Sequence, residues 1–240
     1  DWYGCTLVRG DVHDGSGGQD KEHMVISGRM YPLFPGEAEI VDPAERSMRR
    51  KADEDIDIQA MMVIGYLWNY HLDIKQGAAF TREVNQELGD LQKSYPNRYV
   101  GMGVLTMQNT SQAIKEIERL VKDFGLRSIA LATNVNGKNL DDPTVMPILE
   151  EAVRAGIFIN FHVPSIGIVG ADNALDRFPR YYFRNSLGIP VETTLAIASI
   201  IYAGLLDRFP DAKISFRNAG GFLPYGVGRF DHHYHTREDS

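Results

Sequence analysis

Short apolar stretches alternate with longer helical patterns from about residue 56 to the end of the chain, and this alternation constrains the fold more than any other feature. Five stretches have the character of strands, namely IDIQAMMVIGYLW, RYVGMGVLTM, SIALA, IFINF and AKISF. Strands that are apolar on both faces and alternate with helices are typical of a parallel sheet covered by helices. The pattern therefore predicts an α/β fold, either a doubly wound sheet or a (β/α)8 barrel.

Start and stop signals predict the helices between these strands. Asp42 and Asp142 each precede a proline, as at a helix start, and Gly125 and Gly156 follow helical patterns, as at a helix end. The segment SQAIKEIERLVKDFG is expected to bury one apolar face. That face consists of Ile114, Ile117, Leu120, Val121 and Phe124. Further helices are expected over about 76–95, in PVETTLAIASIIYAGLLDRFP and in LPYGVGRFDHHYH.

Composition excludes several classes of protein. The 240 residues carry a formal net charge of -7 and no basic patch, so neither nucleic acid nor an anionic membrane is an expected partner. No apolar run is long enough for a transmembrane helix, and the N-terminus has no signal-peptide pattern. Cys5 has no second cysteine to pair with, which favours a reducing, cytoplasmic setting. Cys5 is expected to be a packing residue rather than a nucleophile.

Two regions differ in texture. Residues 1–41 are irregular, and CTLVRG and MVISGRMYPLF flank a Gly- and Asp-rich loop with which they could form a hairpin. Residues 42–240 carry the alternating pattern and are expected to form the second domain. There is no Gly-x-Gly-x-x-Gly after a strand and no Walker-type loop, so a dinucleotide or nucleotide site has no support. Polar residues instead cluster after strands, as in the βα loops of a barrel.

Four segments carry a resemblance to a known family. They are YPNRYVGMGVLTMQ, LDDPTVMPILEEAVRAGIFINFHVPS, SLGIPVETTLAIASIIYAGLLDRFPDAKISF and NAGGFLPYGVGR. In this order they resemble the metal-dependent amidohydrolase superfamily, in the branch of aminocarboxymuconate-semialdehyde and resorcylate-type decarboxylases. The resemblance covers roughly residues 42–235. It implies a distorted (β/α)8 barrel, incomplete in this chain with five to six strands visible, and one divalent metal, zinc or manganese, at the carboxyl ends of the strands.

The resemblance implies a partial set of metal ligands. His162, in NFHVPS, matches the metal-binding histidine that follows a strand in the family, and imidazole suits zinc. The alternative is a core histidine. GDVHDG resembles the Asp-x-His-x-His motif of the family, so His13 is a second candidate ligand, although the second histidine of the motif is absent. The final aspartate has no counterpart, so we expect either a fragment or a degenerate relative.

Asn218 falls where the family usually has a catalytic histidine, in a pattern like His-x-Gly-Gly. In those enzymes the histidine acts on the metal-bound water or transfers a proton to the substrate. An amide has no useful pKa and can only donate and accept hydrogen bonds. Asn218 is therefore expected either to position a ligand or to cap the turn that follows it.

Other residues are candidates for substrate binding. Arg229 matches an arginine that reaches the substrate carboxylate in this branch, in some cases across a dimer interface; the alternative is an ion pair with Asp231 or Glu238. Ser165 lies in the NFHVPS stretch and is also a candidate. Three aromatic residues follow the first strand and either line an aromatic-acid pocket or pack under a loop. They are Tyr66, Trp68 and Tyr70.

The histidines near the end of the chain suggest a metal site at first sight. His232 and His235 are three apart on a predicted helix and share a face, with His233 beside them. They follow Arg229 on a helix rather than lying at a strand end, and they have no further ligand assigned. We expect all three to face solvent or an interface.

The resemblance thus implies a non-oxidative decarboxylase of an aromatic or muconate-like carboxylic acid, with a small carboxylic-acid substrate and a homodimeric or higher assembly. Metal-dependent hydrolysis is an alternative within the enzymes. A non-catalytic pseudoenzyme or assembly subunit is an alternative of a different class, which Asn218 and the incomplete ligand set favour.

Overall fold

The computed structural model of the chain describes residues 5–9, 22–26, 29–32, 56–63, 65–164 and 183–237. The contacts between Cα atoms divide the chain into two units, Asp1–Gln59 and Ala60–Ser240. The domain boundary predicted after residue 41 and the helix predicted from Asp42 lie outside the described residues and stay predictions. Within the described residues, no helix combines the length and apolarity that a membrane crossing requires.

The first unit contains an antiparallel sheet in the order β1 (Cys5–Arg9), β2 (Glu22–Ile26) and β3 (Arg29–Pro32). Cys5 lies opposite Ile26, and the pairing of β1 with β2 confirms the predicted hairpin. The second apolar segment of that hairpin divides into two strands, β2 and β3, which pair in antiparallel fashion.

The second unit contains five strands whose spatial order follows their order in the chain. They are β4 (Gln59–Met61), β5 (Tyr99–Gly101), β6 (Ser128–Ala132), β7 (Phe158–His162) and β8 (Ile214–Phe216). β6, β7 and β8 are parallel, and Gly103 after β5 bridges in parallel to Ile129 of β6. A doubly wound sheet reverses its strand order at a switch point, whereas consecutive strands of a (β/α)8 barrel are neighbours. The described strands therefore have barrel order, although they are fewer than eight.

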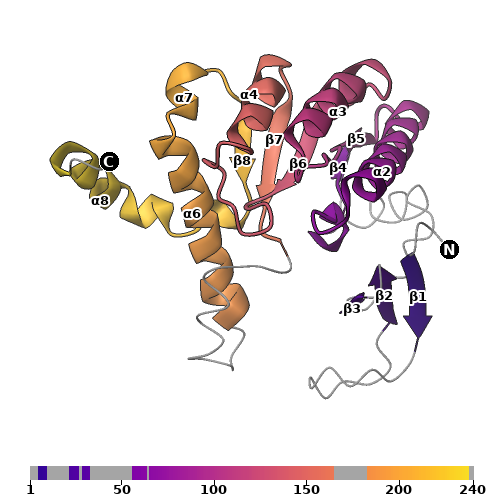
Figure 1. Ribbon diagram of the computed structural model, residues 1–240, viewed down its shortest axis with the longest axis horizontal. Coiled ribbons are helices and arrows are strands. Elements are labelled where there is room, and N and C mark those ends of the chain that lie inside the picture. The colour runs from indigo at the N-terminus through magenta and orange to yellow at the C-terminus, as the bar shows by residue number, and fades with distance from the viewer. Residues whose placement is uncertain are drawn as a thin grey trace. The chain divides into compact units, whose positions relative to one another are not determined.

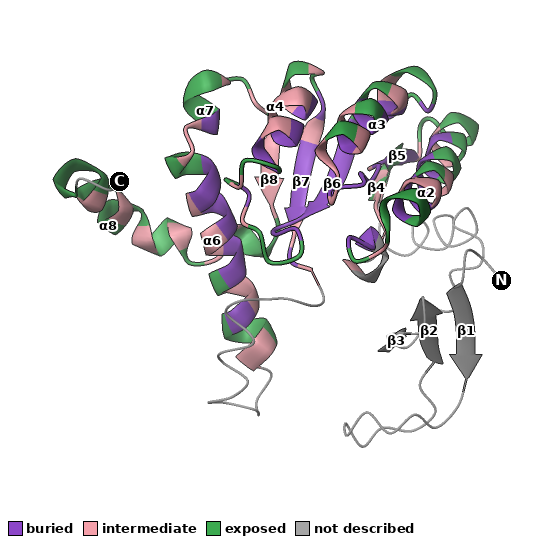
Figure 2. Cartoon of the chain, viewed as in Figure 1, coloured by how far each residue is buried: buried purple, intermediate pink, exposed green. Residues whose placement is uncertain are grey.

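Helices follow the strands and lie along one side of them (Figure 1). They are α2 (Ile74–Ser94), α3 (Thr110–Lys122), α4 (Met146–Arg154), α6 (Ile189–Tyr202), α7 (Leu205–Arg208) and α8 (Leu223–Thr236). Three shorter helical turns are η1 (Gly65–Trp68), η2 (Arg184–Gly188) and η3 (Asn218–Gly220). Strand β6 is buried along its whole length (Figure 2), in agreement with a sequence that is apolar except for Ser128.

Helix α4 begins later than predicted. The carboxylate of Asp142 accepts a hydrogen bond from the backbone N–H of Thr144 at 2.8 Å, which forms a turn rather than a helix cap. The helix itself begins at Met146, with a second proline, Pro147, in its first turn. Gly156 ends this segment with a φ of 69°, as predicted from the glycine stop signal.

The buried face of α3 differs from the predicted apolar face. Ile117 and Leu120 are buried as expected, but Ala113 and Glu116 are buried with them, while Ile114 and Val121 are only half-buried. The buried face of the helix is thus turned by part of a turn from the predicted face, and it includes the carboxylate of Glu116.

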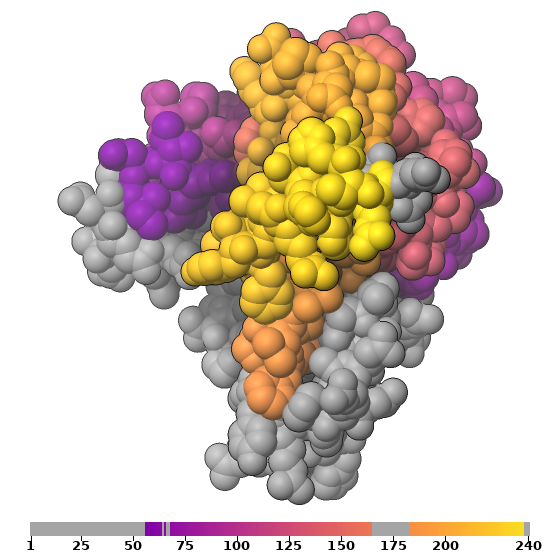
Figure 3. Space-filling model, turned by 90° about the vertical axis from the view of Figure 1, so that its left-hand side faces the viewer, coloured from indigo at the N-terminus to yellow at the C-terminus, as the bar shows by residue number. Residues whose placement is uncertain are grey.

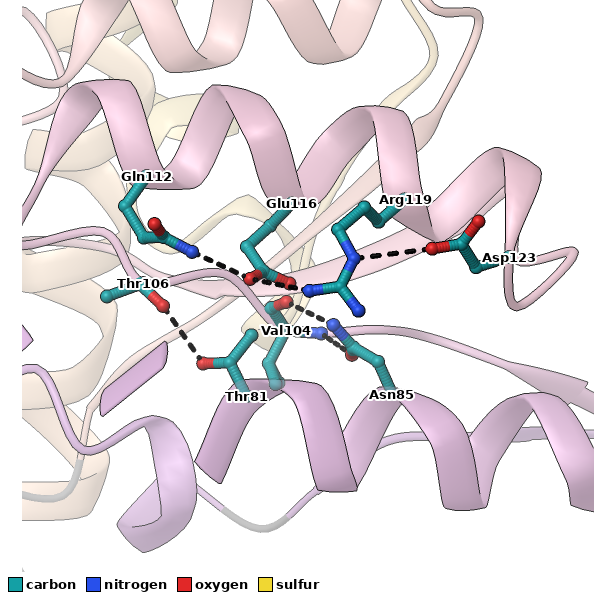
Figure 4. Close-up of polar contacts among 8 residues, drawn as sticks. All are labelled: Thr81, Asn85, Val104, Thr106, Gln112, Glu116, Arg119 and Asp123. Carbon is teal, nitrogen blue, oxygen red and sulfur yellow. Dashed lines mark hydrogen bonds and ion pairs between the residues drawn. The ribbon is translucent and has the colours of Figure 1, made fainter. Parts of the chain in front are cut away.

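A polar cluster between α2 and α3 accommodates this carboxylate (Figure 4). Glu116 Oε1 accepts a hydrogen bond from Gln112 at 2.8 Å and lies 3.7 Å from Arg119 Nη1, while Oε2 is buried without a hydrogen-bond partner. In the same cluster, the Asn85 side chain bonds both the N–H and the carbonyl of Val104, at 2.8 and 3.0 Å. Asn85 thereby holds the segment that follows β5.

The sheet is curled, so that its first and last described strands approach one another. Met62 follows β4, and its sulfur lies 3.7 Å from the Asn160 amide nitrogen in β7 and 3.8 Å from Arg217 Nη1 after β8. These contacts cross the inner face of the sheet and define it as concave.

Candidate active site

The candidate site lies at the carboxyl ends of β6, β7 and β8, on the concave face. Side chains alternate between the two faces of a sheet, and the register pairs Ala130 with Asn160 and Asn160 with Ser215. The Ser215 hydroxyl donates to the Asn160 amide oxygen at 2.8 Å. Two residues further along each strand, His162 and Arg217 fall on this same face.

His162 ends β7 and is half-buried. Its Nδ1 lies 2.7 Å from the carbonyl oxygen of Val163. Because a carbonyl can only accept, this bond requires the proton on Nδ1 and leaves the lone pair of Nε2 available. Burial lowers the pKa of the imidazole, and the charge of Arg217 lowers it further. Neutral imidazole whose other nitrogen donates to the backbone is the arrangement of many metal ligands, so His162 fits the role predicted for it.

Arg217 is a site residue that the sequence analysis missed. It follows β8 directly, and its backbone N–H donates to the carbonyl of Phe161 at 3.1 Å, which continues the pairing of the two strands. The alternation of polar Ser215, apolar Phe216 and polar Arg217 is the signal that could have identified it. Phe216 stacks on Phe161 at 5.0 Å between ring centres on the opposite face.

Asn218 opens the turn after β8 in the left-handed conformation, with a φ of 60°. Its side chain is exposed, and its amide nitrogen lies 3.5 Å from the hydroxyl of Thr193 in α6. Its carbonyl accepts a hydrogen bond from the N–H of Gly221 at 2.9 Å. Asparagine adopts this conformation more readily than most residues, so the turn itself accounts for an asparagine here, and a ligand-positioning role stays a prediction.

The glycine pair after Asn218 lets the turn pack on the start of α6. A Cβ atom on Gly221 would lie 2.3 Å from the carbonyl oxygen of Pro190, and the φ of Gly221 is 62°. The Thr194 hydroxyl donates to that carbonyl at 2.8 Å and accepts from the N–H of Phe222 at 2.7 Å. This part of the motif therefore has a structural reason that is independent of catalysis.

Glu192 is a buried carboxylate that the sequence analysis also missed. It lies on α6 with an exposed fraction of 1%. Its Oε1 accepts hydrogen bonds from the Asn134 amide at 2.7 Å and from the Thr133 hydroxyl at 3.2 Å. Both donors follow β6, so Glu192 fixes the loop that leaves that strand. This loop lies at the carboxyl ends of β6, β7 and β8, which we call the mouth of the site.

Trp68 packs against the candidate ligand. Its side chain is 5% exposed, and its ring centre lies 5.6 Å from that of His162 with the planes tilted by 55°. The indole N–H is buried without a hydrogen-bond partner. The ring forms an apolar wall beside His162, and whether it contacts substrate stays a prediction.

Tyr70 is a packing residue. Its hydroxyl accepts a hydrogen bond from the N–H of Ala132 at 3.3 Å, and its backbone carbonyl accepts one from the Asn136 amide at 2.7 Å. Burial raises the pKa of the phenol, so Tyr70 keeps its proton at physiological pH. Through these two hydrogen bonds Tyr70 connects the end of η1 to the end of β6 and the loop that follows it.

Arg229 lies on α8, apart from His162. It is exposed, and among the described residues it forms no hydrogen bond or ion pair. Asp231, one of its alternative partners, lies 3.6 Å from His235 instead, and Glu238 is outside the described residues. Figure 3 shows α8 on one face of the molecule over α6. The role of Arg229 as a carboxylate anchor stays a prediction.

Two of the three histidines of α8 face solvent, as predicted. His232 and His235 are exposed, and His233 is half-buried. Across the described ranges, no group of three His, Cys, Asp or Glu side chains is arranged to hold a metal ion. The remaining candidates cannot be placed, because His13, Ser165 and the side chain of Tyr66 lie outside the described residues. Of the metal-binding set, the described structure thus offers His162.

Comparison with known proteins gives a consistent family assignment. A family model described as amidohydrolase matches residues 34–235. The 2-amino-3-carboxymuconate-6-semialdehyde decarboxylase of Dictyostelium discoideum is 33% identical over 219 residues, which cover 91% of this chain and 58% of that protein. The chain thus spans less than two thirds of this curated relative.

Solved structures share the fold. A dihydroxybenzoic acid decarboxylase from Polaromonas with bound manganese and the inhibitor 2-nitroresorcinol has a TM-score of 0.71 at 22% identity, over 82% of this chain and 61% of that one. A 5-carboxyvanillate decarboxylase from Novosphingobium aromaticivorans, also with manganese, has a TM-score of 0.72 at 23% identity, over 86% and 62%.

Proposed function

The chain belongs to the amidohydrolase family, and from that membership we propose that it acts as a metal-dependent decarboxylase of an aromatic or muconate-like carboxylic acid. The observation that carries the proposal is His162, a half-buried imidazole with an available Nε2 at the carboxyl end of a parallel strand. The decarboxylases with which the chain aligns support the choice of reaction. The complete barrel that this activity requires is part of the proposal.

The proposed cofactor is one divalent metal. Zinc suits the imidazole of His162, and the manganese in two structural neighbours supports manganese as well. His162 would be one ligand, His13 is the second candidate, and further ligands would come from outside the described residues. A divalent metal at this place supplies positive charge that binds the carboxylate or hydroxyl oxygens of a substrate.

Decarboxylation breaks the bond between the carboxyl carbon and the carbon that bears it. Carbon dioxide leaves, the electron pair stays on the remaining carbon, and a proton takes the place of the carboxyl group. The Asn218 amide cannot deliver that proton, and the Tyr70 hydroxyl is buried in the core beside the N–H of Ala132. The described residues therefore position the substrate, with Trp68 as an apolar wall, and the proton comes from solvent or from a residue that is not described.

Substrate contacts by Tyr66, Ser165 and Arg229 belong to the same proposal. Arg229 is exposed on α8, and in this proposal it reaches the substrate carboxylate across a dimer interface, as in some members of the branch. A homodimer of this kind and a cytoplasmic location are proposed with it. No contact among the described residues favours the alternative reaction, metal-dependent hydrolysis, over decarboxylation.

A non-catalytic relative is the second candidate, and a specific observation favours it. Asn218 stands in a turn for which asparagine is conformationally suited, and the amide cannot replace an imidazole in proton transfer. A family member that had lost its reaction could keep this turn unchanged.

Metal analysis and product detection together test the proposal. We expect purified chain supplied with zinc or manganese to hold about one equivalent of metal, and His162→Ala to lose most of it, as measured by elemental analysis after gel filtration. With 2,6-dihydroxybenzoate or a similar acid, we expect release of carbon dioxide that falls in Arg229→Ala. Stoichiometric metal without carbon dioxide from any such acid would favour the non-catalytic relative. Absence of metal would overturn the enzyme proposal for this chain.

A further inference from the structure

We propose that Arg217 binds the carboxylate of the substrate at the mouth of the site, beside His162. The inference rests on the proposed function and deepens it, because it assigns the group that selects for a negatively charged acid. It is independent of Arg229, which lies on α8.

Strand register places Arg217 beside His162. Phe161 pairs with Phe216, and the N–H of Arg217 then donates to the carbonyl of Phe161 at 3.1 Å. The next pair of positions along the two strands is His162 and Arg217. Since side chains alternate between faces, both share the concave face that the Asn160–Ser215 hydrogen bond marks.

The guanidinium extends across that concave face. Its Nη1 lies 3.8 Å from the sulfur of Met62, which follows β4 at the other side of the described sheet. Because it reaches Met62, the Arg217 side chain lies across the carboxyl ends of the strands. Arg217 is also exposed, so a ligand can reach it without displacing the core.

The guanidinium keeps most of its donors for a ligand. A thioether sulfur is a weak acceptor, whereas arginine carries five N–H donors in a planar fork. No carboxylate forms an ion pair with Arg217 among the described residues. Glu192, the buried carboxylate of this end of the sheet, is bonded to Thr133 and Asn134 instead. A planar carboxylate accepts two parallel hydrogen bonds from such a fork, and an aromatic acid at the mouth supplies one.

The side chain would thus recognise charge and shape together. A neutral ligand of the same size would lose the charge-assisted bonds but keep the apolar contact with Trp68. The difference in affinity between the charged and the neutral ligand therefore distinguishes an arginine that binds substrate from an exposed arginine that has no ligand.

The experiment compares two probes by titration calorimetry, salicylate and its neutral analogue salicylamide, with the full chain loaded with manganese. We expect Arg217→Met to weaken salicylate binding by about tenfold or more, since bonds to charged groups are strong, and to leave salicylamide binding unchanged. Arg217→Lys should lose less, because it keeps the charge without the fork. Lys213→Met, an exposed change at the other end of the same strand segment, should bind both probes as the unmodified chain does.

The outcomes separate this inference from the proposed function. If the unmodified chain prefers salicylate and Arg217→Met keeps that preference, the role of Arg217 is overturned while the proposed function stands. If the unmodified chain binds neither probe, the role of Arg217 is overturned, and carbon dioxide release from the wider set of acids still decides the proposed function separately. Circular dichroism and urea unfolding of each variant distinguish a lost contact from a lost fold, and Arg217→Lys keeps the comparison valid if Arg217→Met does not fold.

Discussion

The carbonyl oxygen of Pro190 lies 2.3 Å from the place where a Cβ atom of residue 221 would be. No real Cβ approaches an oxygen so closely, so the turn after β8 can rest on the first turn of α6 because residue 221 is glycine. The hydroxyl of Thr194, which bridges the same carbonyl and the N–H of Phe222, lies directly beside this contact.

Gly221→Ala should therefore destabilise the chain strongly. The methyl group would meet the Pro190 carbonyl, and the positive φ of 62° is unfavourable for alanine. We expect a loss of about 2 to 5 kcal/mol in the free energy of unfolding, measured by urea denaturation. Gly228→Ala is the matched control, because a Cβ there meets nothing within 4 Å on α8, and it should raise stability by about 0.5 to 1 kcal/mol. Equal effects of the two changes would contradict this account.

Asn218→His should increase decarboxylation if the proposed reaction occurs. Histidine tolerates a positive φ better than most residues, so the turn should survive. An imidazole restores a group that can transfer a proton, worth about a hundredfold or more in rate. We expect carbon dioxide release to rise and to gain a pH dependence near the ordinary histidine pKa of about 6.5. Asn218→Gly keeps the turn without a side chain and should show no gain; a rate unchanged in both variants would count against a catalytic role for this position.

Asn69→Gly should leave stability unchanged or raise it. Asn69 is 4% exposed, has a φ of 52°, and both polar atoms of its amide lack hydrogen-bond partners. Each such buried group costs about 1 to 3 kcal/mol, which offsets the packing lost with the side chain. Asn136→Gly is the control, because Asn136 has a φ of 53° but bonds the carbonyl of Tyr70 at 2.7 Å. We expect thermal unfolding to show a lower midpoint for Asn136→Gly than for Asn69→Gly, and the reverse order would refute the comparison.

Glu116 should make stability depend on pH. Burial raises the pKa of its carboxyl group, while the charges of Arg119 and Arg82 and the hydrogen bond from Gln112 lower it in part. Between the ordinary carboxyl pKa and the raised pKa, the folded chain keeps a proton on Glu116 that the unfolded chain releases. The free energy of unfolding therefore falls as the pH rises through this interval.

Glu116→Gln removes this titration. The difference in free energy of unfolding between this variant and the unmodified chain should grow in favour of the variant as the pH rises above the ordinary glutamate pKa of about 4.3, as measured by urea unfolding at several pH values. Glu118→Gln, which changes an exposed partner of Lys122, is the control for the loss of a surface carboxylate. A difference that does not change with pH for Glu116→Gln would mean that folding leaves the pKa of Glu116 unchanged.

Much of the fold was predictable because it depends on local pattern. SIALA is apolar at every position except Ser128 and forms β6 over these same residues, and Gly125 and Gly156 both take the positive φ expected of helix ends. The burial of Glu116 was not predictable, because the rotation of α3 depends on polar partners that come from α2 and from the helix itself.

The candidate site was predictable only in part. His162 followed from a motif, and its Nδ1 contact with Val163 fits the ligand role. Arg217 required the register between β7 and β8, which joins segments far apart in the chain. Glu192 required knowledge of which helix covers the end of β6. Sequence thus indicated residues that lie in motifs, whereas those defined by pairing between distant segments needed the structure.

The contact between Met62 and Arg217 joins residues that are 155 positions apart, and the strands between them pair in chain order. During synthesis each strand can therefore join its predecessor as it leaves the ribosome, but the mouth is assembled only when β8 arrives. Binding competence would then appear as one of the last events of folding, later than the burial of β6, and the order of the two could be followed by stalling synthesis at successive lengths.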